Sequence, residues 1–343
     1  MKAIAFSEHG DVSQLKYLDL PEPEISAQEV LVKVYACALN HLDIWGRQGM
    51  PGLKLPMPHI LGSDIAGEVA RVGNLITDLR PGARVVVAPG LSCGLCEHCR
   101  SGYDSLCSDY KIIGFQVNGG YAQFVKVPRE NVIPVSESLT PEEWAAVPLV
   151  FLTAWHMLVT RAGLQPGETV LIHGAGSGVG SAGLQIAKYY QAQVIATAGT
   201  DEKLEKARAL GADYGINYSK GDFVGEVTRI TEKTGADVIF DHIGSTTFEK
   251  SLLCLAKKGR LVTCGVTSGP TATIDIRYLF MRQGAILGSY MGGRNELLKV
   301  LSLVEKKILK PVVDIVFPLA EAAAAQKRME TRQQFGKIVL RCT

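Results

Sequence analysis

The sequence lacks the features that mark membrane, nucleic-acid-binding and secreted proteins. No apolar run reaches the roughly 18 residues that a membrane-spanning helix needs. Lys and Arg form no basic stripe, and the net charge of +2 comes from interspersed charges of both signs. The first residues, 1–6, are followed too soon by Glu8 and His9 to form a signal peptide. We therefore expect a cytoplasmic protein that binds neither membranes nor nucleic acid.

Internal repeats and low-complexity tracts are absent as well. The composition that remains, 47% apolar residues with 36 glycines, is typical of an α/β enzyme and excludes a disordered or fibrous chain. A length of 343 residues predicts about two domains.

The pattern of the chain changes near Pro148. Residues 1–147 contain short strands, at 29–36, 65–72 and 83–88, separated by Gly and Pro, which predicts a mostly β domain. From 148 to 288 apolar strands alternate with helical segments, which predicts a doubly wound parallel sheet covered on both faces. The strands of this part are expected at 169–173, 193–197, 237–241 and 260–264, with helices at 179–190 and 201–210. Residues 289–343 contain helix-like stretches at 295–306 and 319–330 and a closing strand at 337–340.

Half of the eight cysteines lie close together, at a spacing of C-x2-C-x2-C-x7-C. They are Cys93, Cys96, Cys99 and Cys107. Four neighbouring thiolates suit a closed tetrahedral zinc site, which has no open position for a substrate. We expect one structural zinc, stabilising a lobe at 91–110 that has too few apolar residues for its own core. A pair of disulfides is the alternative, and it is disfavoured because nothing indicates an oxidising compartment.

A glycine-rich turn at 174–180 stands between an expected strand and an expected helix. In such a turn the backbone approaches a pyrophosphate, and the helix N–H groups face its negative charge. The literal G-x-G-x-x-G at 178–183 starts too far past the strand, so we place the turn in the register that ends at Gly180. This register predicts that Ser177, Gly178, Val179 and Gly180 bind a dinucleotide.

The end of the next strand indicates which dinucleotide is bound. An NAD site normally has an acidic residue there for the ribose 2′-OH, whereas this strand ends in small neutral residues up to Thr200. Asp201 follows at an expected helix N-cap, and Lys203 comes next. Lys203 could pair with a 2′-phosphate and Thr200 could hydrogen-bond to it, although Lys203 could also be an ordinary solvated lysine. The pattern favours NADP(H) over NAD(H).

From end to end the chain resembles the medium-chain dehydrogenase/reductase superfamily. The matching segments are Asn40–Asp43, Pro58–Gly67, the four-cysteine lobe, Phe151–Trp155, the glycine-rich turn, Asp241–Gly244 and Gly336–Leu340. The resemblance implies a GroES-like, mostly β catalytic domain at 1–147, a Rossmann cofactor domain at 148–288 and a return to the catalytic domain at 289–343. It also implies that Thr153 contacts the cofactor near the nicotinamide, and that a dimer or tetramer forms.

The active-site motifs differ from those of the zinc alcohol dehydrogenases in this superfamily. Those enzymes place zinc ligands where this chain has Asn40, Ser63 and the apolar pair Val150 and Phe151. Neutral Asn and Ser are poor zinc ligands, and a catalytic zinc needs three protein ligands. The quinone oxidoreductase branch is similar at Asn40 and at Gly62–Asp64, and it holds the NADPH 2′-phosphate with residues at the positions of Lys203 and Tyr218. This chain departs from that branch by keeping the full zinc lobe.

Displaced ligands are the remaining route to a second zinc. Cys37, His41, His59 and Asp64 lie close in sequence to the position of the missing metal, and Cys37 and His41 would face each other on a helix. An apolar cysteine at the end of a strand, however, is more often a core residue. We therefore expect the lobe zinc alone.

These features lead to a hypothesis for the reaction. A cleft between the domains would hold NADPH, and hydride would pass to a quinone or an α,β-unsaturated carbonyl without a catalytic zinc. Asn40 is the first candidate to donate a hydrogen bond to the developing charge, and Asp43 would orient the local loop or relay a proton. Two alternatives stay open: an alcohol dehydrogenase with non-standard zinc ligands, and an NADPH-binding sensor or structural protein with little turnover.

Overall fold

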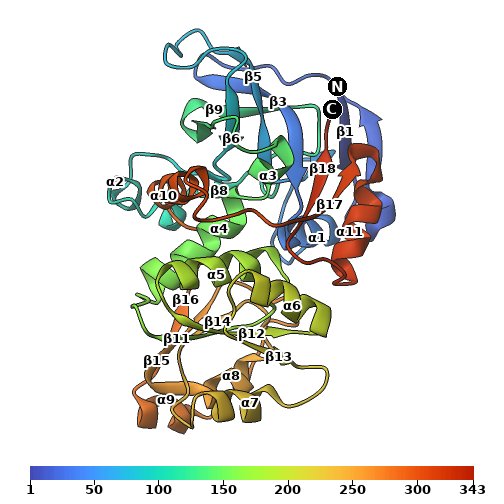
Figure 1. The fold of residues 1–343 in the computed structure, drawn as a ribbon. Helices are drawn as coiled ribbons and strands as arrows, with labels where there is room; N and C mark the ends of the chain where they lie inside the picture. The colour runs from blue at the N-terminus through green and yellow to red at the C-terminus, as the bar shows by residue number, and fades with distance from the viewer. The chain divides into compact units, whose positions relative to one another are not determined.

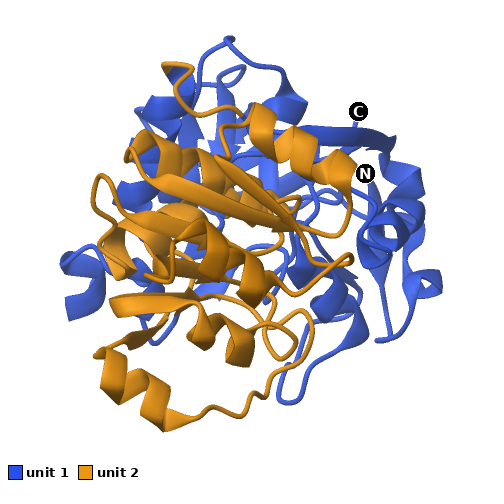
Figure 2. Ribbon diagram, turned by 60° about the horizontal axis from the view of Figure 1, so that its bottom comes forward, with its two compact units in different colours: residues 1–149, 293–305, 311–343 blue, residues 150–292, 306–310 orange.

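The computed structural model describes all residues, 1–343, and divides them into two compact units (Figure 2). Unit 1 comprises 1–149, 293–305 and 311–343, and unit 2 comprises 150–292 and 306–310. The boundaries therefore fall a few residues beyond the expected 147 and 288, and the segment 306–310 belongs to unit 2. No helix combines the length and the apolar character that crossing a bilayer requires.

Unit 1 is built on a seven-stranded sheet with the order β10-β6-β5-β3-β18-β17, to which β9 adds by pairing with β3. Its strands are β3 (Glu29–Ala38), β5 (Asp64–Val72), β6 (Arg84–Val87), β9 (Phe124–Pro128), β10 (Val132–Pro134), β17 (Val313–Pro318) and β18 (Lys337–Arg341). The longest, β3, is buried along most of its length, and each fully buried aliphatic side chain contributes about 1.5–3 kcal/mol. β18 pairs antiparallel with β3 and parallel with β17, so the last residues of the chain complete the sheet begun by the first.

Two small sheets and several short helices surround this sheet (Figure 1). The small sheets are β2-β1-β4, with β1 (Lys2–Phe6), β2 (Lys16–Asp19) and β4 (His59–Ile60), and the pair β7 (Gly90–Leu91) and β8 (Lys111–Ile112). The α-helices are α1 (His41–Gln48), α2 (Glu97–Arg100), α3 (Pro141–Ala145), α10 (Arg294–Glu305) and α11 (Ala322–Glu330), and the 3₁₀ turns are η1 (Val12–Gln14), η2 (Asp104–Leu106), η3 (Arg129–Asn131) and η5 (Leu319–Glu321). Helix α4 (Pro148–Trp155) begins in unit 1 and ends in unit 2.

Unit 2 confirms the predicted doubly wound parallel sheet. Its six strands have the order β13-β12-β11-β14-β15-β16, and every pairing between them is parallel. They are β11 (Thr169–Ile172), β12 (Gln193–Ala198), β13 (Tyr214–Asn217), β14 (Ala236–Asp241), β15 (Leu255–Thr263) and β16 (Ala285–Gly288). Figure 1 shows α5 (Gly178–Tyr189) and α6 (Asp201–Ala209) on one face, and α7 (Phe223–Ile230), α8 (Phe248–Leu253) and α9 (Ile276–Arg282) toward the other. A π-helical turn, η4 (His156–Arg161), precedes β11.

Cys37 is the ninth of ten residues in β3, at the strand end where the sequence placed it, and His41 begins α1, so the two do not share a helix. One local expectation was wrong. The N-cap of α6 is Thr200 and not Asp201: the Thr200 side chain accepts a hydrogen bond from the Lys203 amide at 3.3 Å. Thr200 is the N-cap because its backbone is extended, whereas Asp201 already lies in the first turn of the helix. The negative charge of Asp201 in that turn stabilises the start of the helix.

Candidate functional site

The four clustered cysteines form a site with the dimensions of a zinc tetrahedron. Their sulfur atoms all lie within 4.8 Å of one another, with 3.4 Å between Cys96 and Cys99 and 3.9 Å between Cys93 and Cys99. Four sulfurs around a zinc ion at 2.3 Å would be separated by about 3.8 Å. Backbone N–H groups of Leu95 and Cys96 lower the pKa of the Cys93 thiol to about 6, which favours the thiolate that a metal binds. All four are free thiols, so the structure does not contain the alternative disulfides.

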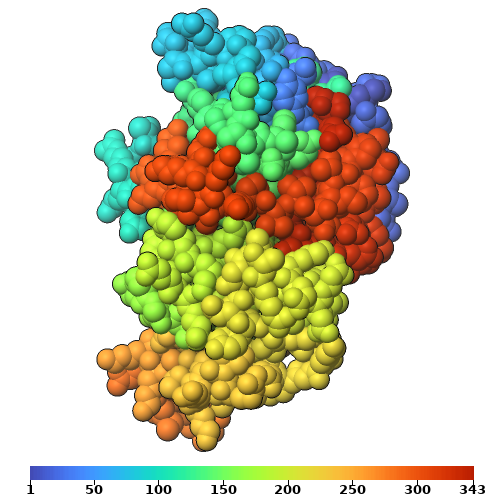
Figure 3. Space-filling view, viewed as in Figure 1, coloured from blue at the N-terminus to red at the C-terminus, as the bar shows by residue number.

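The lobe around these cysteines has almost no hydrophobic core. Leu95 is 72% exposed and Leu106 is 56% exposed, and the lobe contains only short elements, namely β7, α2 and η2. It lies beside the start of α10 (Figures 1 and 3), where the Arg294 amide donates to the Asp104 carboxylate at 2.7 Å. A bound zinc would therefore supply the cross-links that burial does not.

In unit 2, the turn between β11 and α5 has the geometry of a phosphate-binding turn. Ser177 caps α5 by accepting a hydrogen bond from the Gly180 amide at 2.8 Å. The amides of Gly178 and Val179, in the first turn of α5, have no acceptor in the chain. A Cβ at Gly180 would lie 2.4 Å from the Gly174 carbonyl oxygen, so only glycine permits this tight turn. The free amides and the helix dipole suit a pyrophosphate, and α5 starts at Gly178 as the chosen register requires.

Thr153 presents a second indication of a dinucleotide in unit 2. It lies on α4, is 5% exposed, and its hydroxyl has no hydrogen-bond partner. Buried hydroxyls normally find a partner, and an unpaired one costs roughly 1–3 kcal/mol. An amide group such as a nicotinamide carboxamide would satisfy it.

Charged residues of both signs follow the end of β12. Asp201 forms an ion pair with Lys220 and accepts a hydrogen bond from the side-chain amide of Asn217, Nδ2, at 2.7 Å. Lys220 and Asn217 lower the pKa of Asp201, so it is ionised and its charge is already compensated. Lys203 and the half-exposed Tyr218 add a cation and a phenol to the same region, since Tyr218 lies within van der Waals reach of Gly199.

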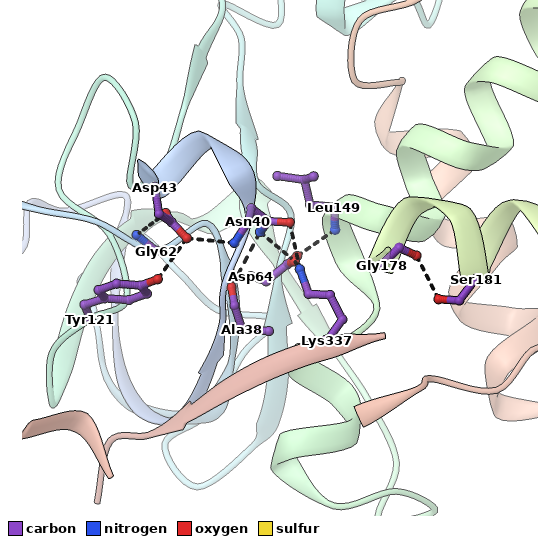
Figure 4. Close-up of polar contacts among 10 residues, drawn as sticks. All are labelled: Ala38, Asn40, Asp43, Gly62, Asp64, Tyr121, Leu149, Gly178, Ser181 and Lys337. Carbon is purple, nitrogen blue, oxygen red and sulfur yellow. Dashed lines mark hydrogen bonds and ion pairs between the residues drawn. The ribbon is translucent and has the colours of Figure 1, made fainter. Parts of the chain in front are cut away.

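In unit 1, Asn40, Asp64 and Lys337 form a buried polar cluster (Figure 4). The Lys337 ammonium donates to Asn40 Oδ1 and to Asp64 Oδ2, both at 2.7 Å. Asn40 Nδ2 donates to the same Asp64 oxygen at 2.9 Å, and the Leu149 amide donates to Asp64 Oδ1 at 2.6 Å. Asp64 and Lys337 are almost fully buried, so a complete ion pair is held away from water.

A second buried carboxylate, Asp43, fixes the start of α1. It accepts hydrogen bonds from the Tyr121 hydroxyl at 2.9 Å, the Asn40 amide at 2.8 Å and the Gly62 amide at 3.2 Å (Figure 4). Together with Asn40 it forms a capping box. Burial raises the pKa of Asp43 to about 6 against the opposing effect of these donors, and burial also raises the pKa of Tyr121. The sequence suggested that Asp43 orients the local loop or relays a proton. These hydrogen bonds are of the kind that orient a loop.

The shifted pKa of Asp43 predicts a pH-dependent contribution to stability. Because its pKa is about 6 in the folded protein and near 3.8 in an unfolded chain, the folded state binds the proton more tightly. This stabilisation is complete below pH 4 and is lost as the pH rises through 6. Relative to Asp43→Asn, which does not titrate, the wild type should lose on the order of 3 kcal/mol of unfolding free energy between pH 4 and 7. Urea denaturation of both proteins across this range tests it, and a difference independent of pH would contradict it.

The residues around Asn40 do not fit a catalytic zinc. The Asn40 side chain is already hydrogen-bonded to Lys337 and Asp64. Ser63 has a buried hydroxyl without a partner, which is a poor zinc ligand, and Val150 has no ligand atom. A metal ion there would lie beside a buried ammonium, which repels it. The Cys93–Cys107 cluster is the one group of three or more His, Cys, Asp or Glu side chains close enough to hold a metal.

The displaced ligands do not assemble either. Cys37 is fully buried in β3, and burial raises the pKa of its thiol well above the usual range. His59 is buried against Phe6, with ring centroids 5.7 Å apart, and burial lowers its pKa to about 4. His41 stacks edge-on against Trp45 at 4.9 Å.

Sequence reasoning missed Lys337 and Tyr121 as site residues. Lys337 stood in a family motif and was assigned only to a closing strand. One signal could have marked it, because a lysine directly before the apolar run Ile338–Leu340 must either snorkel to solvent or find a buried acid. Tyr121 had no such signal, since its partner Asp43 lies 78 residues away.

Comparisons with known proteins identify the family of both units. Residues 26–137 match the family model of the alcohol dehydrogenase GroES-like domain, and residues 178–306 match that of the zinc-binding dehydrogenase. A crystal structure described as an NAD-dependent alcohol dehydrogenase is 45% identical, with a TM-score of 0.97 over 100% of both chains. The NAD-dependent alcohol dehydrogenase of Sulfurisphaera tokodaii is 33% identical, and the quinone oxidoreductase of Pseudomonas aeruginosa is 31% identical, each over 99% of both chains.

Proposed function

The chain belongs to the medium-chain dehydrogenase/reductase superfamily and is an oxidoreductase, and we propose that it transfers hydride from NADPH to quinones or α,β-unsaturated carbonyls without a catalytic zinc. The observation that supports this proposal most is the Lys337 ammonium bound between Asn40 and Asp64. It is a buried positive charge in contact with Asn40, the residue at the position of one zinc ligand in zinc-dependent members. Zinc binding at that place would require removing a buried, hydrogen-bonded cation.

The residues of unit 2 are proposed to bind and orient the cofactor. NADPH supplies the hydride when bound. The amides of Gly178 and Val179 would hold its pyrophosphate at the start of α5, and the Thr153 hydroxyl would bond the carboxamide of the nicotinamide. Thr200, Lys203 and Tyr218 would surround the 2′-phosphate. We propose NADPH although two similar proteins are named NAD-dependent, because the acid of this region, Asp201, is already paired with Lys220.

The residues of unit 1 are proposed to act on the substrate. Hydride addition to a quinone or an enone produces a phenolate or an enolate, whose charge is delocalised and needs only modest stabilisation. Asn40 remains a candidate donor, since one Nδ2 hydrogen faces only the Ala38 carbonyl at a long 3.5 Å. Asp43 acts indirectly, because its carboxylate fixes the Asn40 backbone at the start of α1.

The test is the oxidation of NADPH with a panel of quinones and enones, before and after treatment with a mild chelator. The proposal expects steady turnover that the chelator leaves unchanged. The same protein is offered alcohols with NADP⁺ and NAD⁺ as a control. Alcohol oxidation that a chelator abolishes would contradict the proposal in favour of a zinc alcohol dehydrogenase, and tight NADPH binding without turnover on any acceptor would exclude catalysis.

A substitution of Lys203 tests the choice of cofactor. Lys203→Ala should weaken NADPH binding roughly tenfold to hundredfold, because a charged hydrogen bond to phosphate contributes about 1.5–3 kcal/mol. NADH, which lacks the phosphate, should bind the variant as it binds the wild type. Lys206→Ala removes a lysine from the same helix that pairs with Glu202 at 2.8 Å, and it should change neither affinity. Titration of cofactor fluorescence measures both, and equal losses for NADPH and NADH would contradict the phosphate contact.

We also propose that the protein forms a homo-oligomer, a dimer or tetramer. Strand β16 lies at the edge of the unit 2 sheet and has a free hydrogen-bonding side. The neighbouring helix α9 exposes Ile276, Phe280 and Met281 to more than 60% each. Light scattering of the purified protein determines the number of chains, and a monomer would contradict the proposal.

A further inference from the structure

Lys337 has an unusual environment for a lysine. It is the first residue of β18, its side chain is 4% exposed, and its two acceptors come from β5 and from the start of α1. Lysine side chains are almost never buried unless they are paired. Here the ammonium is paired with the buried Asp64 carboxylate at 2.7 Å.

The hydrogen bonds of this cluster leave one strong donor unused. An ammonium group has three N–H donors, and Lys337 uses two of them, on Asn40 Oδ1 and Asp64 Oδ2. Asp64 accepts three hydrogen bonds in all, because it also accepts from Asn40 Nδ2 and from the Leu149 amide. The third N–H of Lys337 has no acceptor in the chain. A buried, charged donor without a partner is costly, and a substrate oxygen would satisfy it.

We propose that Lys337 is a catalytic residue that donates this third hydrogen bond to the carbonyl oxygen of the acceptor while hydride is added. This inference rests on the proposed function. It identifies the residue that would stabilise the negative charge on the substrate oxygen, which a catalytic zinc would otherwise stabilise. In this step the C–H bond at C4 of bound NADPH would break and a C–H bond would form at the electrophilic carbon of the acceptor, while the π electrons shift to its oxygen. The resulting enolate oxygen would lie beside the Lys337 ammonium. Water would then protonate the α-carbon of an enone product, whereas a quinone product would lose a proton from the reduced carbon and gain one on each oxygen to become the hydroquinone.

Asn40 and Asp64 have separate roles in this arrangement. Asp64 forms the ion pair with Lys337, and Asn40 Oδ1 orients the ammonium without adding negative charge. A cysteine thiolate at the position of Asn40 would instead compete with the substrate oxygen for the cation. The neutral amide therefore leaves the charge of Lys337 less compensated and more available to an oxyanion.

The central experiment compares wild type with Lys337→Met under single-turnover conditions with NADPH. Loss of one oxyanion donor typically lowers kcat by about 10²–10³-fold, and we expect a loss of this size, with the Kd for NADPH changed less than threefold. Lys188→Met, which removes another lysine paired with an aspartate at 2.8 Å, is the control and should keep the wild-type rate. Because Lys337→Met leaves Asp64 buried without its cation, the double variant Lys337→Met/Asp64→Asn is measured as well, and it should fold and show the same loss.

A series of acceptors separates catalysis from structural support. The rate loss in both variants should increase with the basicity of the product oxygen, so it should be largest for simple enones and smallest for electron-poor quinones. A loss that is equal for all acceptors, or one matched by weaker NADPH binding, would overturn the inference. An unchanged rate in the variants of an active wild type would overturn it and leave the proposed function standing. A wild type that binds NADPH and reduces no acceptor would overturn the proposed function, and this inference with it.

Discussion

Substitution of Cys107 by serine should remove the zinc and unfold the lobe at 91–110. The wild type is expected to contain one zinc per chain, held by the four clustered cysteines. Structural zinc in small cysteine sites contributes an apparent binding free energy of about 10–16 kcal/mol, and the lobe has few buried apolar side chains that could replace it. Elemental analysis measures the metal, and limited proteolysis should cut the variant within the lobe while the wild type resists.

The control for this substitution is Cys264→Ser, which alters a cysteine outside the lobe and should keep the full zinc content. Retention of zinc by Cys107→Ser would contradict the four-thiolate site. Two zinc ions per wild-type chain would have a different consequence. They would show that the residues around Asn40 bind a metal despite Lys337, and the proposed reaction would then have to be replaced.

Replacement of Arg47 by methionine should strongly destabilise unit 1. The Arg47 side chain is fully buried on α1, donates to the Gly10 carbonyl at 2.6 Å and to Gln326 at 2.8 Å, and forms an ion pair with Glu330. Breaking a buried pair by removing one partner costs about 3–5 kcal/mol, because the other groups stay buried without compensation. Hydrogen exchange read by peptide should show faster exchange in α1 and α11, by about 10²–10⁴-fold if the whole loss is local.

The matched control is Arg71→Met, because Arg71 forms an ion pair with Glu22 in which both side chains are largely exposed. Exposed pairs contribute about 0–1 kcal/mol, so exchange in this variant should hardly change. If Arg47→Met behaved in the same way, the buried network between α1 and α11 would not hold the two helices together.

The sequence was sufficient to predict most of unit 2. Each βα step there is local, the strands are continuous apolar runs, and the turn before α5 carries its own glycine and capping signals. An element that was missed, β13, is a four-residue strand without a strong pattern. Its place is decided by the neighbouring strand of the sheet and not by its own residues.

Unit 1 was harder to predict because its contacts join distant parts of the chain. Asn40 was recognised from its motif, but its partner Lys337 lies 297 residues later, and nothing local in either segment indicates the pairing. The same holds for Arg47 and Glu330, which are 283 residues apart. Family motifs located the individual residues, whereas the Lys337 ammonium comes to lie beside Asn40 and Asp64 only when β18 pairs with β3.

The position of β18 also has a consequence for the order in which the protein is made. Unit 2 is complete in sequence by residue 310, so its sheet and turn can form while the rest is still being synthesised. The sheet of unit 1 cannot be completed until residues 337–341 leave the ribosome, because they form β18, which pairs with β3. The ammonium of Lys337 is therefore added late, and an incomplete chain can carry a folded unit 2 without assembling the cluster of Asn40, Asp64 and Lys337.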